Sequence, residues 1–166
     1  MANADYQCAL AGRDDIPAIL KIQESNLKDN GGELSIRFPR AWFERAIADM
    51  PIVVARRNGR VVGYVVSTEL TAQAHDPIIR AMLRAHPGLP GAYNYGPICV
   101  DEDHRGRGVA VSMFERLRAL LPGREGFTFI RRDNVSSLNF HRRMGMTQVA
   151  EFALGEVDYV VVAYGG

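Results

Sequence analysis

Strand-length runs of apolar, β-branched and aromatic residues recur along the whole chain. Two of these runs flank Asn58-Gly59, a dipeptide that strongly predicts a tight β-hairpin. A third run contains Pro97, which cannot donate a backbone hydrogen bond, so we expect a bulge or a break in pairing there. The predicted strands cover residues 6–11, 52–55, 60–70, 93–100, 127–130, 146–153 and 157–164.

Between the strands, apolar residues repeat at helical spacing and are bounded by capping and breaking residues. The predicted helices run from Asp14 or Asp15 to the Asn30-Gly31-Gly32 break, from Pro39 to Met50, from Asp76 to Pro87, from Gly108 to Pro122 and from Asn134 to Gly145. The stretch 71–91, which holds the third of these helices, is long for a connection between strands. Connections of that length are usually functional or belong to an interface.

The elements follow one another in the order β-α-α-β-β-(helical insert)-β-α-β-α-β-β. This order predicts a single α/β domain over residues 1–166, with a mixed, mostly antiparallel sheet of seven strands. About four helices flank the sheet, and the helical insert, about residues 71–91, stands between the third and fourth strands. A chain of 166 residues with 47% hydrophobic residues is long and apolar enough to form one such core.

The clearest candidate for chemistry is the turn between the strand that ends at Val100 and the helix that follows it. The turn reads Arg105-Gly106-Arg107-Gly108-Val109-Ala110. Glycines let a backbone approach a ligand closely, and the first N–H groups of a helix have no partner within the helix. The arginines and the helix dipole add positive charge. The pattern therefore indicates a binding site for a phosphate or pyrophosphate.

Other phosphate-binding patterns fit this turn less well. No G-x-x-x-x-G-K-[ST] run is present, and the dinucleotide fingerprint G-x-G-x-x-G has Val111 at its third glycine. A nucleotide-binding domain that uses Gly106 and Gly108 is one open alternative. A solvated basic turn before an ordinary helix is the other.

Two motifs together resemble the GCN5-related N-acetyltransferase (GNAT) superfamily. Arg105, Gly108 and Ala110 behind a strand resemble the R-x-x-G-x-A pattern of the family's acetyl-CoA pyrophosphate loop. One helix and one strand later, residues 134–146 resemble the family's helix that begins with Asn and ends in Gly and an apolar residue. The resemblance covers nearly the whole chain and implies the GNAT fold, with the insert as its main departure. It also implies acetyl-CoA as the cosubstrate. The Cys and His residues show no metal-ligand spacing, so we expect no metal.

The resemblance further implies direct attack of an amine on the acetyl-CoA thioester in a ternary complex. In that reaction backbone N–H groups near Cys99 and Val100 would polarise the thioester carbonyl, and Asn134 would bond the CoA arm or serve as a plain helix cap. The implied cofactor-binding residues are Ile98, Cys99, Val100, Arg105, Gly106, Arg107, Gly108, Val109, Ala110 and Asn134.

Proton transfer has one candidate acid and two candidate bases. His141 stands seven residues after Asn134, where many relatives carry the Tyr that protonates the departing CoA thiolate. Residues about two turns apart share a helix face, so His141 is the candidate general acid. The alternative is a helix histidine that bonds a carbonyl. Glu69, at the end of a strand, and Tyr95, beside the expected bulge, are the candidate bases.

Charge and cysteine content narrow the class of protein. The net charge of +1 speaks against a general nucleic-acid or membrane-surface binder, so we expect neither partner. Cys8 and Cys99 both lie in apolar runs, where we expect buried, reduced thiols. The first residues lack the basic and apolar regions of a signal peptide. These features together predict a cytoplasmic protein.

The leading hypothesis is an acetyl-CoA-dependent N-acetyltransferase that acts on the primary amine of a small molecule or peptide. We expect the acceptor between the 26–38 loop and the 71–91 insert, the least regular parts of the chain. A homodimer through the insert helix is left open. The missing Tyr and the unassigned base favour an alternative, a non-catalytic acyl-CoA-binding or sensing domain of GNAT type.

Overall fold

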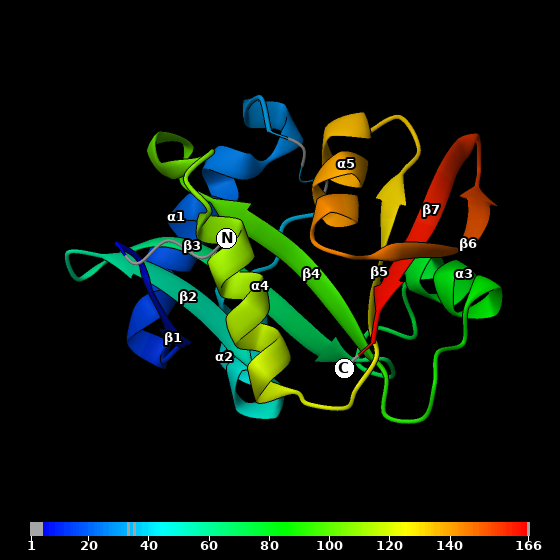
Figure 1. Cartoon of the computed structure of the whole chain (residues 1–166), viewed down its shortest axis with the longest axis horizontal. Coiled ribbons are helices and arrows are strands. Elements are labelled where there is room, and N and C mark those ends of the chain that lie inside the picture. The colour runs from blue at the N-terminus through cyan, green and yellow to red at the C-terminus, as the bar shows by residue number, and fades with distance from the viewer. Residues whose placement is uncertain (1–4, 33, 35, 166) are drawn as a thin grey trace. The chain divides into compact units, whose positions relative to one another are not determined.

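A computed structural model describes residues 5–32, 34 and 36–165 (Figure 1). Its strands are β1 (Gln7–Leu10), β2 (Ile52–Arg57), β3 (Arg60–Glu69), β4 (Tyr93–Val100), β5 (Gly126–Arg131), β6 (Thr147–Leu154) and β7 (Val157–Tyr164). Its α-helices are α1 (Ile16–Asn26), α2 (Arg40–Asp49), α3 (Pro77–Ala85), α4 (Val109–Leu120) and α5 (Val135–Arg143). The predicted order of elements is confirmed, with α3 as the helical insert.

The strands form a seven-stranded mixed sheet in the order β1-β2-β3-β4-β5-β7-β6. The pairs β1–β2, β2–β3, β5–β7 and β6–β7 are antiparallel, whereas β4 and β5 are parallel. The predicted fold class is therefore confirmed. Within the described chain, the parallel ladder joins Tyr93 to Gly126 and Asn94 to Phe127, and residues 95–100 of β4 lie outside it.

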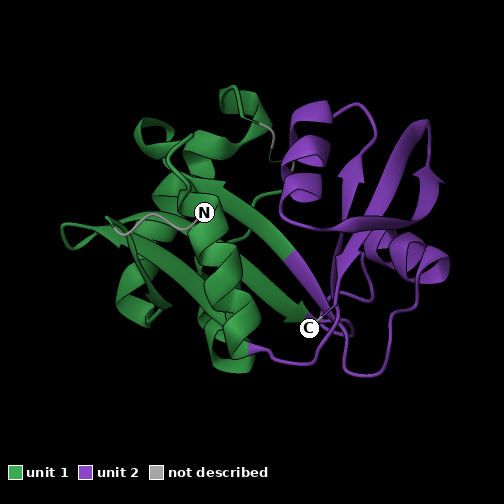
Figure 2. Ribbon diagram, in the orientation of Figure 1, with its two compact units in different colours: residues 1–68, 96–120 green, residues 69–95, 121–166 purple. Residues whose placement is uncertain are grey.

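The chain divides into two compact units, shown in different colours in Figure 2. The first unit consists of residues 1–68 and 96–120, and the second of residues 69–95 and 121–166. Strand β4 contributes its first residues to the second unit and its last residues to the first. That residues 1–166 act as one domain stays a prediction.

In the first unit, β2 is buried on both of its faces. Ile52 and Val54 belong to an apolar cluster with residues of α1 and α2. Side chains alternate along a strand, so Val53 and Ala55 point to the opposite face. Helix α4 packs against β1 and β2 and accounts for that second buried face. This double cover explains why residues 52–55 read as a continuous apolar run.

In the second unit, the apolar face of α3 is buried within its own chain. Asp76 caps the helix by accepting a hydrogen bond from the N–H of Ile78, as its position before Pro77 predicts. Helix α3 packs against β6. Its buried cluster consists of Ile79, Met82, Ala92, Phe127, Val161 and Ala163. Since Ile79 and Met82 are used in this way, α3 has less apolar surface left for an acceptor or a second copy.

The turns follow the predicted chemistry, with one difference in length. Asn58 and Gly59 both have positive φ, +50° and +76°, as the predicted tight hairpin requires. The last hairpin has a two-residue turn, Gly155-Glu156, because Leu154 pairs with Val157 instead of lying in the turn as predicted. At the expected irregularity in β4, Gly96 has a φ of +101° and the Gly96–Pro97 peptide is cis. Among the described residues, no helix is both long enough and apolar enough to cross a membrane.

Candidate functional site

The glycine turn is built as the sequence predicts, between the end of β4 and the start of α4. Asp101 accepts a hydrogen bond from the N–H of Asp103 and opens a short 3-10 turn over residues 102–104. Gly106 and Gly108 then have φ of +72° and +80°, conformations that side chains other than glycine rarely adopt. These two reversals direct the backbone into the first turn of α4, which begins at Val109.

The first turn of α4 presents backbone N–H groups that lie beyond the hydrogen bonds of the helix itself. The N–H of Ser112 bonds the carbonyl of Gly108 at 3.0 Å. The N–H groups of residues 109–111 therefore lie at the open end of the helix, where they have no partner within the helix. A side chain at Gly106 would meet nothing within 4 Å, so the space beside the turn is open. Such a turn, with the positive end of a helix dipole, fits a pyrophosphate group.

Arg105 is anchored to the protein at the entrance to this turn. Its Nε donates to the carbonyl of Val100 at 3.3 Å, and its Nη2 donates to Oδ1 of Asn26 at 3.0 Å. The guanidinium therefore links the start of the glycine turn to the ends of β4 and α1. Arg107, the other arginine of the motif, is exposed.

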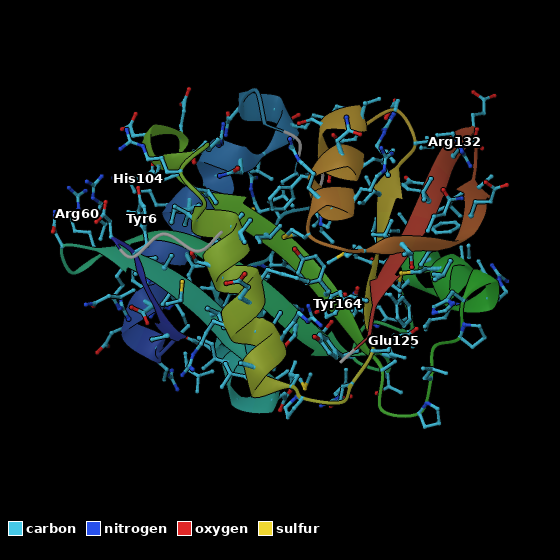
Figure 3. The ribbon with its side chains drawn as sticks, viewed as in Figure 1. Tyr6, Arg60, His104, Glu125, Arg132 and Tyr164 are labelled. Carbon is cyan, nitrogen blue, oxygen red and sulfur yellow. The ribbon has the colours of Figure 1, made fainter. Side chains whose placement is uncertain are left out.

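His104, the residue before Arg105, is held by the beginning of the chain. The hydroxyl of Tyr6 lies 3.0 Å from its Nδ1, and the two rings meet edge to face (Figure 3). Tyr6 is buried, and the guanidinium of Arg57 lies 5.6 Å from the centre of its ring. The 3-10 turn ahead of the glycines is thus tied to residues far away in sequence.

Sequence reasoning did not identify Tyr6 or Asn26 as residues of this site. Tyr6 reads only as the start of a strand, and Asn26 only as a polar residue near a helix end. Neither belongs to a local motif, because both act through contacts with residues 74 to 98 positions away.

The end of β4 packs tightly against β3. Cys99 is buried, and a side chain added at Gly63 of β3 would lie 3.1 Å from the Cys99 carbonyl oxygen. Burial raises the pKa of the Cys99 thiol to about 11, although the Tyr64 hydroxyl and the charge of Arg105 act in the opposite direction. The expected buried, reduced state of this cysteine therefore agrees with its surroundings. Cys8, in contrast, is only partly buried.

In the second unit, α5 begins at the predicted cap. Oδ1 of Asn134 accepts a hydrogen bond from the N–H of Ser137 at 3.1 Å, which is the plain capping role. His141 lies two turns further on and is buried, with an exposed fraction of 5%. Its Nδ1 donates to the carbonyl of Ser137 at 2.7 Å. This is the carbonyl-bonded helix histidine that the sequence left as an alternative to the general acid.

The protonation state of His141 follows from its surroundings. Burial lowers its pKa, and the hydrogen bond to Ser137 only partly offsets that effect. Because a carbonyl can only accept, Nδ1 carries the proton in the neutral ring and Nε2 holds the lone pair. His141 can donate from Nε2 only after it is protonated to the imidazolium. Its role as a general acid stays a prediction, now restricted to low pH.

The two candidate bases lie in different surroundings within the second unit. Tyr95 is 1% exposed, and its ring meets the rings of His141 and Tyr164 edge to face at 5.6 and 5.8 Å. The carboxylate of Glu69 is paired with Nη2 of Arg124 at 3.3 Å and is half exposed. Both oxygens of the Glu69 carboxylate lie 3.3 Å from Nη2 of Arg124, so this pairing occupies the atoms that would accept a proton from an amine. Both assignments stay predictions.

The sequence profile of a family described as "Acetyltransferase (GNAT) family" matches residues 19–146. This span contains both the glycine turn and helix α5. No curated protein sequence matches the chain.

Several solved structures share this fold over nearly their whole length. An N-acetyltransferase from Staphylococcus aureus Mu50 is 19% identical with a TM-score of 0.70, covering 98% of this chain and 99% of that chain. Ard1 from Thermoplasma volcanium is 15% identical with a TM-score of 0.73, covering 98% of each chain. YncA from Salmonella typhimurium, a putative acetyltransferase solved with acetyl-CoA, is 19% identical with a TM-score of 0.70. The match covers 97% of this chain and 94% of that chain. At these identities the likeness establishes the fold alone.

Proposed function

The chain belongs to the acetyltransferase (GNAT) family, and we propose that it transfers the acetyl group of acetyl-CoA to the primary amine of a small molecule or peptide. The observation that carries this proposal is the pair of positive-φ glycines, Gly106 and Gly108, that leads into the N-terminus of α4. The turn lies inside the span matched by the family. The likeness in fold to a protein solved with acetyl-CoA supports the same cosubstrate.

The pyrophosphate of CoA would be held mainly by the backbone of the glycine turn and by the first N–H groups of α4, from residues 106–111. Arg107 would add positive charge beside them, whereas Arg105 would shape the turn through its bonds to Asn26 and Val100. Backbone groups of Ile98, Cys99 and Val100, at the end of β4, are the proposed contacts for the pantetheine. Asn134, the cap of α5, is the proposed contact for the CoA arm.

Acetyl-CoA would supply the acetyl group as a thioester. In the proposed transfer, the amine nitrogen gains the acetyl group and loses a proton, and the CoA sulfur leaves and gains one. Cys99 is no plausible covalent carrier, because a thiol with a pKa of about 11 holds almost no thiolate at neutral pH. This supports direct transfer to the amine in a ternary complex.

Backbone N–H groups near Cys99 and Val100 are the proposed donors to the carbonyl oxygen of the reacting thioester. Proton delivery to the leaving sulfur is assigned to His141 only where its ring is charged, and to water at higher pH. Glu69 and Tyr95 remain the proposed routes for removing the amine proton, directly or through water.

A non-catalytic acyl-CoA-binding domain is the second candidate. Two observations favour it: His141 is buried and bonded to its own helix, and the carboxylate of Glu69 is paired with Arg124. Such a domain would bind CoA through the same glycine turn without turnover.

A screen of primary amines and peptides with acetyl-CoA, read by thiol release, tests the proposal. Calorimetry with CoA, with and without NAD as competitor, is run alongside it. We expect CoA binding that NAD does not affect, and thiol release with at least one amine. CoA binding without turnover across the screen would favour the sensing domain, and competition by NAD would revive the dinucleotide alternative.

A further inference from the structure

Asn26 is the last residue of α1, and its side chain joins three segments of the first unit. Its Nδ2 donates to the carbonyl of Ile22 at 2.9 Å and to the carbonyl of Val100 at 3.2 Å. Its Oδ1 accepts from Nη2 of Arg105 at 3.0 Å. The amide uses both of its donors and one acceptor position, and the reversed orientation would set its oxygen against two carbonyls. This arrangement therefore fixes the direction of the side chain.

The two contacts beyond α1 fix both ends of the segment that leads into the glycine turn. At one end, Asn26 bonds the Val100 carbonyl, and the N–H of Asp101 in the same peptide group bonds the Val62 carbonyl at 2.8 Å. At the other end, Asn26 holds the guanidinium of Arg105. Residues 101–105 are thus held at their beginning and at their end by one side chain.

The backbone of Asn26 is equally fixed, by the segment that follows α1. The N–H of Leu34 bonds its carbonyl at 2.9 Å, and the N–H of Lys28 bonds the Leu34 carbonyl at 2.8 Å. Gly32 comes so close that a Cβ there would lie 2.0 Å from the Asn26 carbonyl oxygen. Only glycine allows this approach, which accounts for Gly32 in the Asn30-Gly31-Gly32 run.

We propose that Asn26 is a positioning residue that couples the 27–34 segment to the pyrophosphate-binding turn. The proposal rests on the proposed function, since it assigns the turn to CoA. Through Val100 and Arg105, Asn26 holds the glycine turn ready for the cofactor. Through its own backbone, it transmits the state of that turn to the 27–34 segment, part of the stretch where the sequence predicts the acceptor.

The test compares the full-length protein with Asn26→Ala, using CoA alone as the probe. We expect the Kd for CoA to rise about tenfold, because two hydrogen bonds that hold the turn are lost. Asn30→Ala is the matched control, since Asn30 lies in the same segment and the described hydrogen bond of its side chain goes to the Glu24 carbonyl, at 2.7 Å. We expect the control to bind CoA like the wild type. Circular dichroism and the Tm establish that each variant folds.

Hydrogen exchange supplies a readout that a merely structural asparagine would not change. In the wild type, CoA should slow the exchange of the Lys28 and Leu34 amides. In Asn26→Ala the same amides should no longer respond to CoA, whereas in Asn30→Ala they should respond as in the wild type. Lys28 and Leu34 amides that stay sensitive to CoA in Asn26→Ala would overturn the coupling.

Should Asn26→Ala fold poorly, Arg105→Ala by itself breaks the same contact from its other side, and the response of the Lys28 and Leu34 amides to CoA is then measured in that variant. Where both variants fold, a double-mutant cycle adds a second test. Arg105 is exposed, so Arg105→Ala is the variant more easily tolerated by the fold. If Asn26 acts through Arg105, the two substitutions remove the same contact. The Kd of the double variant for CoA should then exceed the larger of the two single-variant Kd values by no more than about twofold. Fully additive losses would overturn the inference. A wild-type protein that binds no CoA would overturn the proposed function as well, whereas unchanged affinity in Asn26→Ala would overturn only the inference.

Discussion

The hydroxyl of Tyr6 and Nδ1 of His104 lie 3.0 Å apart, although 98 positions separate the two residues in the chain. His104 is the last residue of the 3-10 turn and immediately precedes Arg105. The bond to Tyr6 therefore holds the turn itself, whereas Asn26 holds Val100 before it and Arg105 after it. The N-terminal segment thereby contributes to a turn that no local motif connects with it. Figure 3 labels both residues.

We expect Tyr6→Phe to weaken CoA binding about three- to tenfold, the loss that one hydrogen bond usually brings. The ring keeps its contact with Arg57, so the Tm should fall by only about 2–4 °C and the variant should stay folded. Tyr159→Phe, which removes a hydroxyl from β7 in the second unit, is the control. Calorimetry with CoA measures both, and equal affinities for the two variants would contradict the role given to Tyr6.

Gly108→Val should abolish CoA binding while the fold persists. At a φ of +80° a β-branched side chain is strained, so the substitution should distort the turn that presents the proposed pyrophosphate contacts. Gly123→Val is matched in strain, with a φ of +73° and nothing within 4 Å of an added Cβ. Both variants should lose stability in thermal unfolding, but only Gly108→Val should lose CoA in calorimetry. Intact binding by Gly108→Val would exclude this turn as the pyrophosphate site.

The contrast between local and distant signals explains what the sequence predicts well. The hairpin at Asn58-Gly59, the cap at Asn134 and the turn at Gly106 and Gly108 depend on φ angles and bonds between near neighbours. Tyr6 and Asn26 escape prediction because their partners are brought to them only by the fold. The burial of a single side chain is equally hard to predict from sequence. Helical phase places His141 on the same helix face as Asn134, but its desolvation and its bond to Ser137 can be seen only in the structure.

The ion pair of Asp15 and Arg56 should stabilise the first unit above acidic pH. Burial alone would raise the pKa of Asp15, but the hydrogen bonds from Arg56 and Gly12 and the charge of Arg56 lower it overall. A carboxyl with a lowered folded-state pKa stabilises the protein above its unfolded pKa of about 3.9, and this contribution is lost as the pH falls through the folded value. We expect Asp15→Asn to lower the free energy of unfolding by about 2 kcal/mol at pH 7 and by much less near pH 2.

Denaturant unfolding at several pH values measures that difference. Asp14→Asn is the control, because Asp14 is exposed beside the same helix. If the free energy of unfolding lost in Asp15→Asn were as large in acid as at pH 7, the loss would come from altered packing and not from the ion pair.

Protonation of His141 should destabilise the second unit at mildly acidic pH. Its folded-state pKa lies below the unfolded value of about 6.5, so the unfolded chain takes up the proton first. The stabilising contribution is complete above about pH 6.5 and is lost as the pH falls toward the folded value, with a slope of at most about 1.4 kcal/mol per pH unit. His141→Phe should lack this part of the slope, whereas His75→Gln, at an exposed histidine, should keep it. Equal slopes in wild type and His141→Phe would contradict the burial argument.

The catalytic part played by His141 can be separated from this structural one by its pH dependence. Nδ1 is committed to the Ser137 carbonyl, so only the imidazolium can donate a proton to a leaving thiolate from Nε2. With a pKa below about 6.5, less than about 3% of the ring is charged at pH 8. We therefore expect His141→Phe to lower kcat at pH 8 by less than about threefold, far below the ~10²–10⁴ of a positioned general acid. The measurement is kcat against pH with an amine found in the screen. A loss this small would leave water as the proton source for the leaving thiolate. A loss of a hundredfold or more at pH 8, with wild-type kcat falling as the pH rises above 6, would instead establish His141 as the acid.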